Sequence, residues 1–261
     1  MLKPLLQRIL RNYHLTFSNK GLPNRVAVYF HHLESDTHAE FRDFVSYFSE
    51  REYSFVSADA YSHPEAKQVF VSFDDNYQSW HQSLGLLDDL NISATFYANS
   101  LPFRDTAAAD VINDYFRRVE HHGEQVSLSR AELKEISDAG HCIASHSHSH
   151  FDLGSLPFQD AVEEILMNKA ILEKITGKPV EHFSFPFGMR RNFSEQLSNW
   201  CLSNGFKTIC NAIPGMQHSP FETNNIYRTN WRFNLSLDEN IDLLKVDGSL
   251  FERLTGKSPI G

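Results

Sequence analysis

The chain has 261 residues, which suffices for one large α/β domain or two modest ones. Its formal net charge is −9, from 24 basic and 33 acidic side chains, and this argues against a nucleic-acid partner, which needs a basic face. Three cysteines without a Cys-x-x-Cys pair argue against a disulfide framework, so we expect a reducing, cytoplasmic location.

Residues 1–24 are predicted to form an amphipathic extension ahead of a single domain that spans residues 25–261. Leucine and isoleucine recur at helical spacing in MLKPLLQRIL, interrupted by Lys3 and Arg8. No apolar run is long enough for a signal-peptide core or a membrane span. The favoured interpretation is a helix that caps the domain, and the alternative is a cationic helix in peripheral contact with a membrane.

Short apolar runs alternate with helical patterns along the rest of the chain. The expected order is strand 25–30, helix 38–52, strand 67–73, helix 78–90, strand 93–99, helix 129–140, strand 141–145, helix 158–177, strand 180–188, helix 194–205, strand 207–212 and strand 225–231. Residues 100–127 carry no readable motif, and 242–254 is a helix or an irregular cap. This regular alternation predicts a parallel sheet, open or closed.

Three polar groups directly follow predicted strands. They are Asp74 with Asp75, the histidines between His146 and His150, and the segment Pro186-Phe187-Gly188. Functional residues of parallel α/β folds gather where strands end and the following loops begin. We therefore expect the three groups to converge on one mouth of the sheet.

The histidine spacing allows two arrangements. On a strand, His146, His148 and His150 would share one face, whereas on a helical turn His146 and His150 would meet while His148 points away. Either arrangement offers imidazoles to zinc. Two imidazoles and one carboxylate would leave an open position for water, which is typical of catalytic zinc, and the adjacent carboxylate could take a proton. Taken alone, Asp-Asp-Asn after a strand is more typical of a turn and helix cap than of a catalytic pair.

Three motifs together resemble the polysaccharide deacetylases, the NodB-like carbohydrate esterases of the family 4 type. They are VSFDDNY (71–77), SHSHSHFDL (145–153) and FSFPFG (183–188), and they occur in the family's order. VYFHHLE (28–34) is similar to an N-terminal strand of the branch that acts on glucosamine polymers. The resemblance covers roughly residues 25–230, and it implies a distorted, incomplete (β/α) barrel with about seven strands.

The resemblance also implies roles for particular residues. Asp74 would be the general base, and Asp75, His146 and His150 would bind one divalent metal ion, while His148 falls at a variable position. The family thus favours the helical-turn arrangement. Zinc is the expected ion, and cobalt, nickel or iron would suit the same ligands. The amide of Phe187, after Pro186, would hold the oxyanion. Independently of the family, Trp231 follows a strand and is a candidate for stacking on a sugar ring.

Two family features have no match in the sequence. Ser184 and Phe185 stand where many members carry an arginine that orients the base, and no Leu-x-His motif, the family's source of the general acid, follows residue 231. His31 aligns with the histidine of the resembling branch and is the preferred donor, ahead of His32, His182 and His218. The alternative is that His31 supports the site by hydrogen-bonding a metal-binding carboxylate.

The predicted function is therefore metal-dependent hydrolysis of N-acetyl groups on amino sugars of a glycan or glycan precursor. One alternative is a catalytically inactive relative that binds a glycan or a partner protein through the same cleft. The other is an amide hydrolase that acts on a small non-sugar substrate.

Overall fold

The computed structural model describes residues 21–61, 66–120, 126–217 and 222–248. Most of the expected N-terminal extension and the end of the 242–254 segment lie outside these residues. Every strand pair in the described sheet is parallel. The strands are β1 (Arg25–Phe30), β2 (Ser54–Val56), β3 (Gln68–Asp74), β4 (Thr95–Ala98), β5 (Cys142–Ser145), β6 (His182–Ser184), β7 (Thr208–Cys210) and β8 (Thr229–Asn230).

The sheet curls into a barrel that does not fully close. Its strands follow the order β7-β6-β5-β4-β3-β1-β8, and β2 pairs with the start of β3. The edges β7 and β8 do not pair with each other; a bridge between Cys210, at the end of β7, and Ile226, shortly before β8, connects the two sides. The expected distorted, incomplete barrel with about seven strands is confirmed, since seven strands lie on the continuous path and β2 is a short addition.

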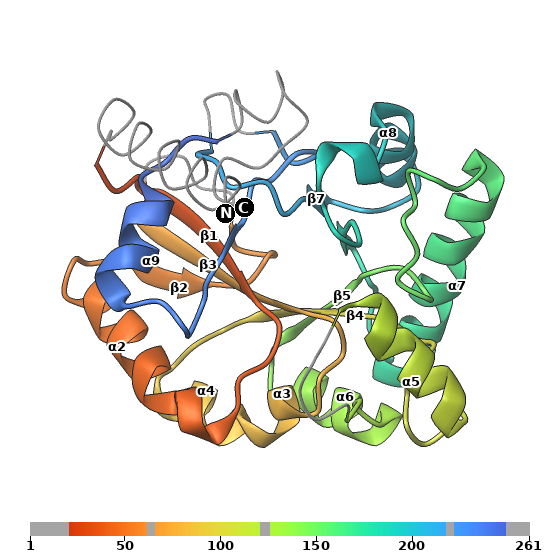
Figure 1. Cartoon of the computed structure of the whole chain (residues 1–261), viewed down its shortest axis with the longest axis horizontal. Coiled ribbons are helices and arrows are strands. Elements are labelled where there is room, and N and C mark those ends of the chain that lie inside the picture. The colour runs from red at the N-terminus through yellow and green to blue at the C-terminus, as the bar shows by residue number, and fades with distance from the viewer. Residues whose placement is uncertain (1–20, 62–65, 121–125, 218–221, 249–261) are drawn as a thin grey trace, which may run out of the picture.

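Helices cover the outside of the curled sheet (Figure 1). They are α2 (His38–Ser49), α3 (Ser79–Gln82), α4 (Leu84–Asp89), α5 (Ala109–Arg118), α6 (Arg130–Asp138), α7 (Phe158–Thr176), α8 (Glu195–Ser203) and α9 (Leu237–Leu244), with short 3-10 turns η1 (Ser35–Thr37) and η2 (Arg190–Asn192). The predicted capping box of Ser129 and Glu132 starts α6. Helix α5 lies in the segment without a readable motif, and it buries Tyr115 and Phe116.

Strand alternation gives the sheet two apolar faces of different size. On β3, Val69, Val71 and Phe73 point outward into the main core beneath the helices, and the Phe73 ring stacks on Phe96 with centroids 4.9 Å apart. On the opposite face a smaller group, here called the inner cluster, fills the barrel interior: Ala27, Ala58, Tyr61, Phe70, Tyr97, Ala144, Cys210 and Ile226. The barrel interior is therefore packed rather than open, and polar inward-facing residues remain only toward its two ends.

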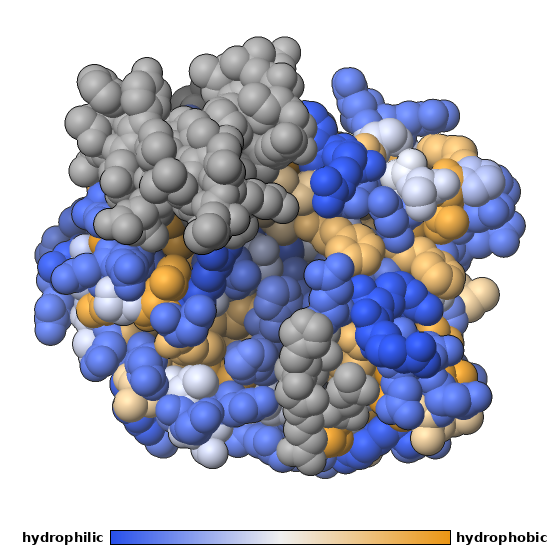
Figure 2. All heavy atoms as spheres, viewed as in Figure 1, coloured by the Kyte–Doolittle hydropathy of each residue, from blue (hydrophilic) through white to orange (hydrophobic). Residues whose placement is uncertain are grey.

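The molecular surface in the orientation of Figure 1 is mostly hydrophilic, with small hydrophobic patches and a hollow near its centre (Figure 2). None of the helices within the described ranges is long and apolar enough to cross a bilayer.

Candidate active site

Asp74, the last residue of β3, forms a bidentate ion pair with Arg228. Both nitrogen–oxygen distances are 2.8 Å, and the side chains of Arg228 and Asp74 are 0% and 5% exposed. Arg228 also donates to the hydroxyls of Ser72 and Ser184 and, through Nε, to the carbonyl of Asn211. Because the guanidinium fork matches a carboxylate in its plane, this pairing fixes the orientation of Asp74.

Aromatic rings enclose the Arg228–Asp74 pair. The guanidinium carbon of Arg228 lies 4.9 Å from the ring centroids of both Tyr29 and Tyr97, a distance at which cations interact with π faces. Burial alone would lower the pKa of Arg228, but the carboxylate of Asp74 raises it above its ordinary value. Burial raises the pKa of Tyr29 to about 12, so this phenol is neutral near pH 7. Arg228 and Asp74 are thus both charged, and their opposite charges cancel within the pair.

Arg228 was not predicted from the sequence. The family's orienting arginine was expected near Ser184 and Phe185, where this chain has none, whereas the structure supplies an arginine from a position 154 residues after Asp74 in the chain. One signal was available: Arg228 interrupts a predicted strand, 225–231, whose other inward-facing positions would be buried. A charged residue in such a position needs a buried partner of opposite charge.

A bend after β3 brings Asp75 beside Asp74. Neighbouring residues on a regular strand point to opposite faces, but Asp75 and Asn76 have φ angles of 80° and 63°. Asp and Asn enter this left-handed region more readily than most residues. The side chain of Asn76 donates to Ser127 Oγ at 3.1 Å, and its carbonyl accepts from Leu128 N at 3.0 Å, which holds the bend.

His146 and His150 meet at Asp75. Their Nε2 atoms lie 3.3 and 3.1 Å from Asp75 Oδ1, and their ring centroids are 5.0 Å apart. His146 Nδ1 lies 2.8 Å from the carbonyl of Ser184. Because a carbonyl can only accept, Nδ1 carries the proton and Nε2 keeps a free lone pair, the tautomer that metal-binding histidines adopt.

The expected pairing of His146 with His150 is present, but the backbone is not a helical turn. Ser147 and His150 have φ angles of 64° and 58°, and the chain between them is a loop. Three hydrogen bonds shape it: His150 N donates to Ser147 Oγ, and Asn99 Nδ2 donates to the carbonyls of His146 and Ser147. His148 points away, with Nδ1 2.8 Å from Ser100 Oγ.

The three side chains of Asp75, His146 and His150 fit a divalent metal ion. Their ligand atoms lie within 4.8 Å of one another and all three residues are buried. Within the described residues, Asp75 Oδ1 has close contacts to the two imidazoles but no hydrogen bond of good geometry. Burial alone would raise the pKa of Asp75, but the imidazoles of His150, His146 and His31 hold it well below its ordinary value. Since Arg228 neutralises Asp74, the charge of Asp75 is available to a cation. The donor set of two nitrogens and one oxygen suits zinc, cobalt, nickel or iron.

His31 and Phe187 line the same cavity, of about 90 Å³, as the two aspartates. His31 Nε2 lies 3.7 Å from Asp75 Oδ2, and its side chain is 38% exposed at the cavity mouth. The ring of Phe187 packs edge-on against His150, with centroids 4.7 Å apart. His31 is therefore close enough to Asp75 to support it and open enough to reach a substrate.

The segment Pro186-Phe187-Gly188 forms a tight turn at the end of β6. Gly188 N donates to the carbonyl of Pro186 at 2.7 Å, and the central residue, Phe187, has a φ angle of 60°. Bulky side chains rarely adopt this conformation, which costs about 1–3 kcal/mol. A Cβ at Gly188 would lie 2.4 Å from the backbone nitrogen of Ala212, so only glycine fits. No hydrogen bond among the described residues uses the Phe187 N–H.

Trp231 does not reach the cavity, and its interpretation as a platform for a sugar ring is wrong. It is 5% exposed and packs in the main core, with its ring centroid 4.5 Å from that of Phe44. Along the strand that contains Arg228, alternation turns Trp231 to the opposite, outer face.

The first prediction concerns the Arg228–Asp74 pair. Arg228→Met should lower the free energy of unfolding by about 3–5 kcal/mol, because it leaves the Asp74 carboxylate buried and unpaired. Arg228→Met combined with Asp74→Asn should recover part of that loss, since no charge then remains. Denaturant unfolding measures both, and Arg42→Met, at a half-exposed surface ion pair, is the control. An equal loss in the single and double variants would contradict the assigned role.

The second prediction concerns the metal ligands. His146→Ala and His150→Ala should each reduce the bound zinc by one ion per chain, because each removes a nitrogen ligand. His148→Ala should leave the zinc content unchanged, since this ring faces Ser100. Metal analysis of dialysed protein checks these results. Retention of zinc by His150→Ala together with its loss from His148→Ala would overturn the ligand set.

Comparison with solved structures shows the same fold in other proteins, two of which are described as deacetylases. A polysaccharide deacetylase from Bacillus cereus is 20% identical, with a TM-score of 0.62 over 84% of this chain and 68% of that one. Deacetylase PplD from Streptococcus pyogenes is 15% identical, with a TM-score of 0.66 over 87% and 97%. IcaB from Ammonifex degensii is 17% identical, with a TM-score of 0.58 over 86% and 96%. At these identities the likeness establishes the fold alone.

The sequence itself identifies the family. Among curated proteins no significant match is found. The family described as polysaccharide deacetylase matches residues 61–206, more than half of the chain, and this range includes Asp74, Asp75, both paired histidines and the Pro186 turn. The chain therefore belongs to the polysaccharide deacetylase family, and it is a hydrolase of carbon–nitrogen bonds other than peptide bonds.

Proposed function

We propose that the protein is a metal-dependent deacetylase that removes N-acetyl groups from amino sugars in a glycan or glycan precursor. The observation that carries the proposal is the contrast between two adjacent buried carboxylates. Asp74 is neutralised and oriented by Arg228, whereas Asp75 faces the paired imidazoles of His146 and His150. Metal-dependent amide hydrolysis needs a positioned base and a cation site, and neighbouring residues would supply them here.

Asp75, His146 and His150 would hold the ion, which would supply Lewis acidity toward the acetyl carbonyl and make water acidic near neutral pH. Asp74 would accept the proton of the attacking water. Arg228 uses one lone pair of each Asp74 oxygen, and a carboxylate has further lone pairs with which to accept that proton. Because both carboxylate oxygens are fixed, Asp74 needs no reorientation before it acts.

Two other groups at the cavity complete the proposed chemistry. The N–H of Phe187, held in its strained turn, would donate to the oxygen that becomes negative as the carbonyl is attacked. His31 would protonate the departing amine, or it would support Asp75 through the 3.7 Å contact.

The size of the cavity favours a small acyl group as the part of the substrate that enters it. Pockets that enclose drug-sized ligands have volumes of about 300–1,000 Å³, whereas this cavity has about 90 Å³. The sugar would then lie outside, near the exposed ring of Phe187. In support, the Streptococcus pyogenes deacetylase of the same fold is in complex with acetate, the acid that this reaction would release.

The third prediction tests the base. Asp74→Asn should lower the rate of acetate release from N-acetylglucosamine oligomers by about 10²–10⁴-fold, because the amide cannot accept the proton of water. The bound metal should stay, since Asp75 and both histidines are intact. Normal turnover by Asp74→Asn would refute the assignment of the base.

Chelation separates the proposal from its two alternatives. Acetate release that a chelator abolishes and zinc or cobalt restores excludes an inactive glycan-binding protein. Chelator-sensitive hydrolysis of ureides or imides, with none of acetylated sugars, would instead identify an amide hydrolase for small non-sugar substrates.

The fourth prediction tests His31 as the acid. His31→Ala should slow hydrolysis of N-acetyl amides sharply but spare an activated acetyl ester, whose leaving group needs no proton. His32→Ala is the matched control, because the neighbouring ring packs against Tyr77 and Phe233 instead of lining the cavity. Equal losses on amide and ester would remove the acid role and leave His31 as support for Asp75.

A further inference from the structure

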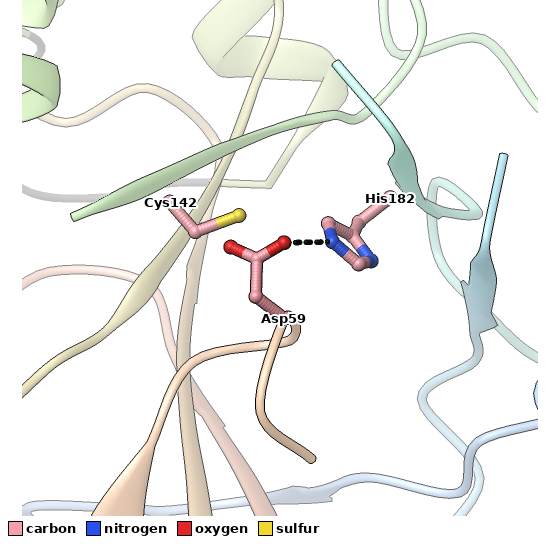
Figure 3. Close-up of side chains that lie close together, drawn as sticks. All are labelled: Asp59, Cys142 and His182. Atoms are coloured by element: carbon pink, nitrogen blue, oxygen red, sulfur yellow. Dashed lines mark hydrogen bonds and ion pairs between the residues drawn. The ribbon is translucent and has the colours of Figure 1, made fainter. Parts of the chain in front are cut away.

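A second group of metal-ligating side chains lies at the opposite end of the barrel from the candidate active site. Cys142 is the first residue of β5, His182 is the first of β6, and Asp59 lies shortly after β2. Their ligand atoms lie within 4.8 Å of one another. Figure 3 shows the sulfur of Cys142 and the ring of His182 converging on the carboxylate of Asp59.

The ring of His182 is held in place for ligation. Its Nε2 lies 2.9 Å from Asp59 Oδ1, and its Nδ1 lies 2.8 Å from Thr208 Oγ1. Because a carboxylate can only accept, Nε2–H donates to Asp59 in the ion-free protein, and an ion would replace that proton. The hydroxyl of Thr208 can then accept from Nδ1–H, which frees the Nε2 lone pair for the ion. The His182 side chain is 3% exposed and that of Asp59 is 58% exposed, so an ion could enter from the Asp59 side.

The inner cluster separates this group from the active site. Cys142 lies four residues before His146, which corresponds to roughly 13 Å along an extended chain. Ala144, Tyr97 and Cys210 of the inner cluster fill the barrel between the two polar ends. Neither group of ligands can therefore contribute to the other.

The chemistry of the three ligands favours zinc. A thiolate is a soft ligand that selects zinc over magnesium or calcium, and an imidazole and a carboxylate complete three protein ligands. A cavity of about 170 Å³, lined by all three side chains, leaves room for water at a fourth position. Burial raises the pKa of the Cys142 thiol, so ion binding must release its proton to solvent.

We propose that Asp59, Cys142 and His182 bind a second divalent ion, Zn²⁺, which ties the starts of β5 and β6 to the segment after β2. This site is independent of the proposed deacetylase chemistry and has a structural role. If no ion binds, the same contacts are only a hydrogen-bonded chain from Thr208 to Cys142.

Cobalt is the probe of choice, because a thiolate ligand gives Co²⁺ a near-ultraviolet charge-transfer absorption that nitrogen and oxygen ligands do not. Only the second site contains sulfur, so this absorption reports on that site alone. The wild-type protein with two equivalents of Co²⁺ should show it. Cys142→Ser should abolish it, and Cys201→Ser, at a buried cysteine in α8, should preserve it.

Two further variants make the test decisive. His146→Ala should lose one cobalt ion yet keep the charge-transfer absorption, which separates failure of this site from failure of the active site. Asp59→Ala changes a side chain exposed at the rim, so it should fold normally and lose the absorption at one equivalent of Co²⁺. In the His146→Ala background, zinc should raise the Tm, and added Cys142→Ser should remove that rise. Absence of the absorption in wild-type protein, or its persistence in Cys142→Ser, would overturn the proposal.

Discussion

The buried pair of Arg228 and Asp74 is the interaction on which the rest of the site depends. A lone buried carboxylate or guanidinium would be strongly destabilising, so each residue requires the other. Arg228 also bonds to groups on β3, on β6 and after β7. Arg228 lies directly before the edge strand β8, and Asn211 lies directly after the other edge strand β7, so Arg228 spans the incomplete closure that the bridge between Cys210 and Ile226 also crosses. One ion pair therefore links the edges of the sheet and orients the candidate base.

The same pair determines the electrostatics of its neighbour. With Asp74 paired to Arg228, the neighbouring carboxyl responds to the imidazoles instead: those of His150, His146 and His31 hold the pKa of Asp75 well below its ordinary value. A cation can then be bound without competing for Asp74. Two identical side chains, adjacent in sequence, acquire different tasks because their partners differ, and the left-handed φ angles of Asp75 and Asn76 make this possible by turning both carboxylates to one side.

Local pattern predicted most of the strands and helices, because each buries a face whose period is visible in a short window of sequence. It also located the Asp-Asp pair, the histidine loop and the proline turn, all of which sit directly after strands. The role of Arg228 was not predicted because its partner Asp74 is distant in the chain, and a long-range ion pair produces no periodic pattern in the sequence. Trp231 was wrongly assigned to the site because it stands at the end of a predicted strand. Strand alternation counted from the inward-facing Arg228 would have placed the Trp231 side chain on the outer face. Helix α5 was missed although Val111, Ile112, Tyr115 and Phe116 recur at helical spacing, because its segment was treated as a loop without a motif.

The inner cluster separates the two polar ends of the barrel. The two ends share one scaffold, but the energetic coupling between them is weak. Because the buried rings and methyl groups of the inner cluster lie between the two ends, a change of charge at one end acts on the other across an apolar layer. Substitutions more than about 7–10 Å apart without common partners have nearly additive effects on stability. The end of the barrel that holds Asp59, Cys142 and His182 is thus a region where new ligands or new loops could arise, by mutation or by engineering. Such changes would not disturb the chemistry at the candidate active site.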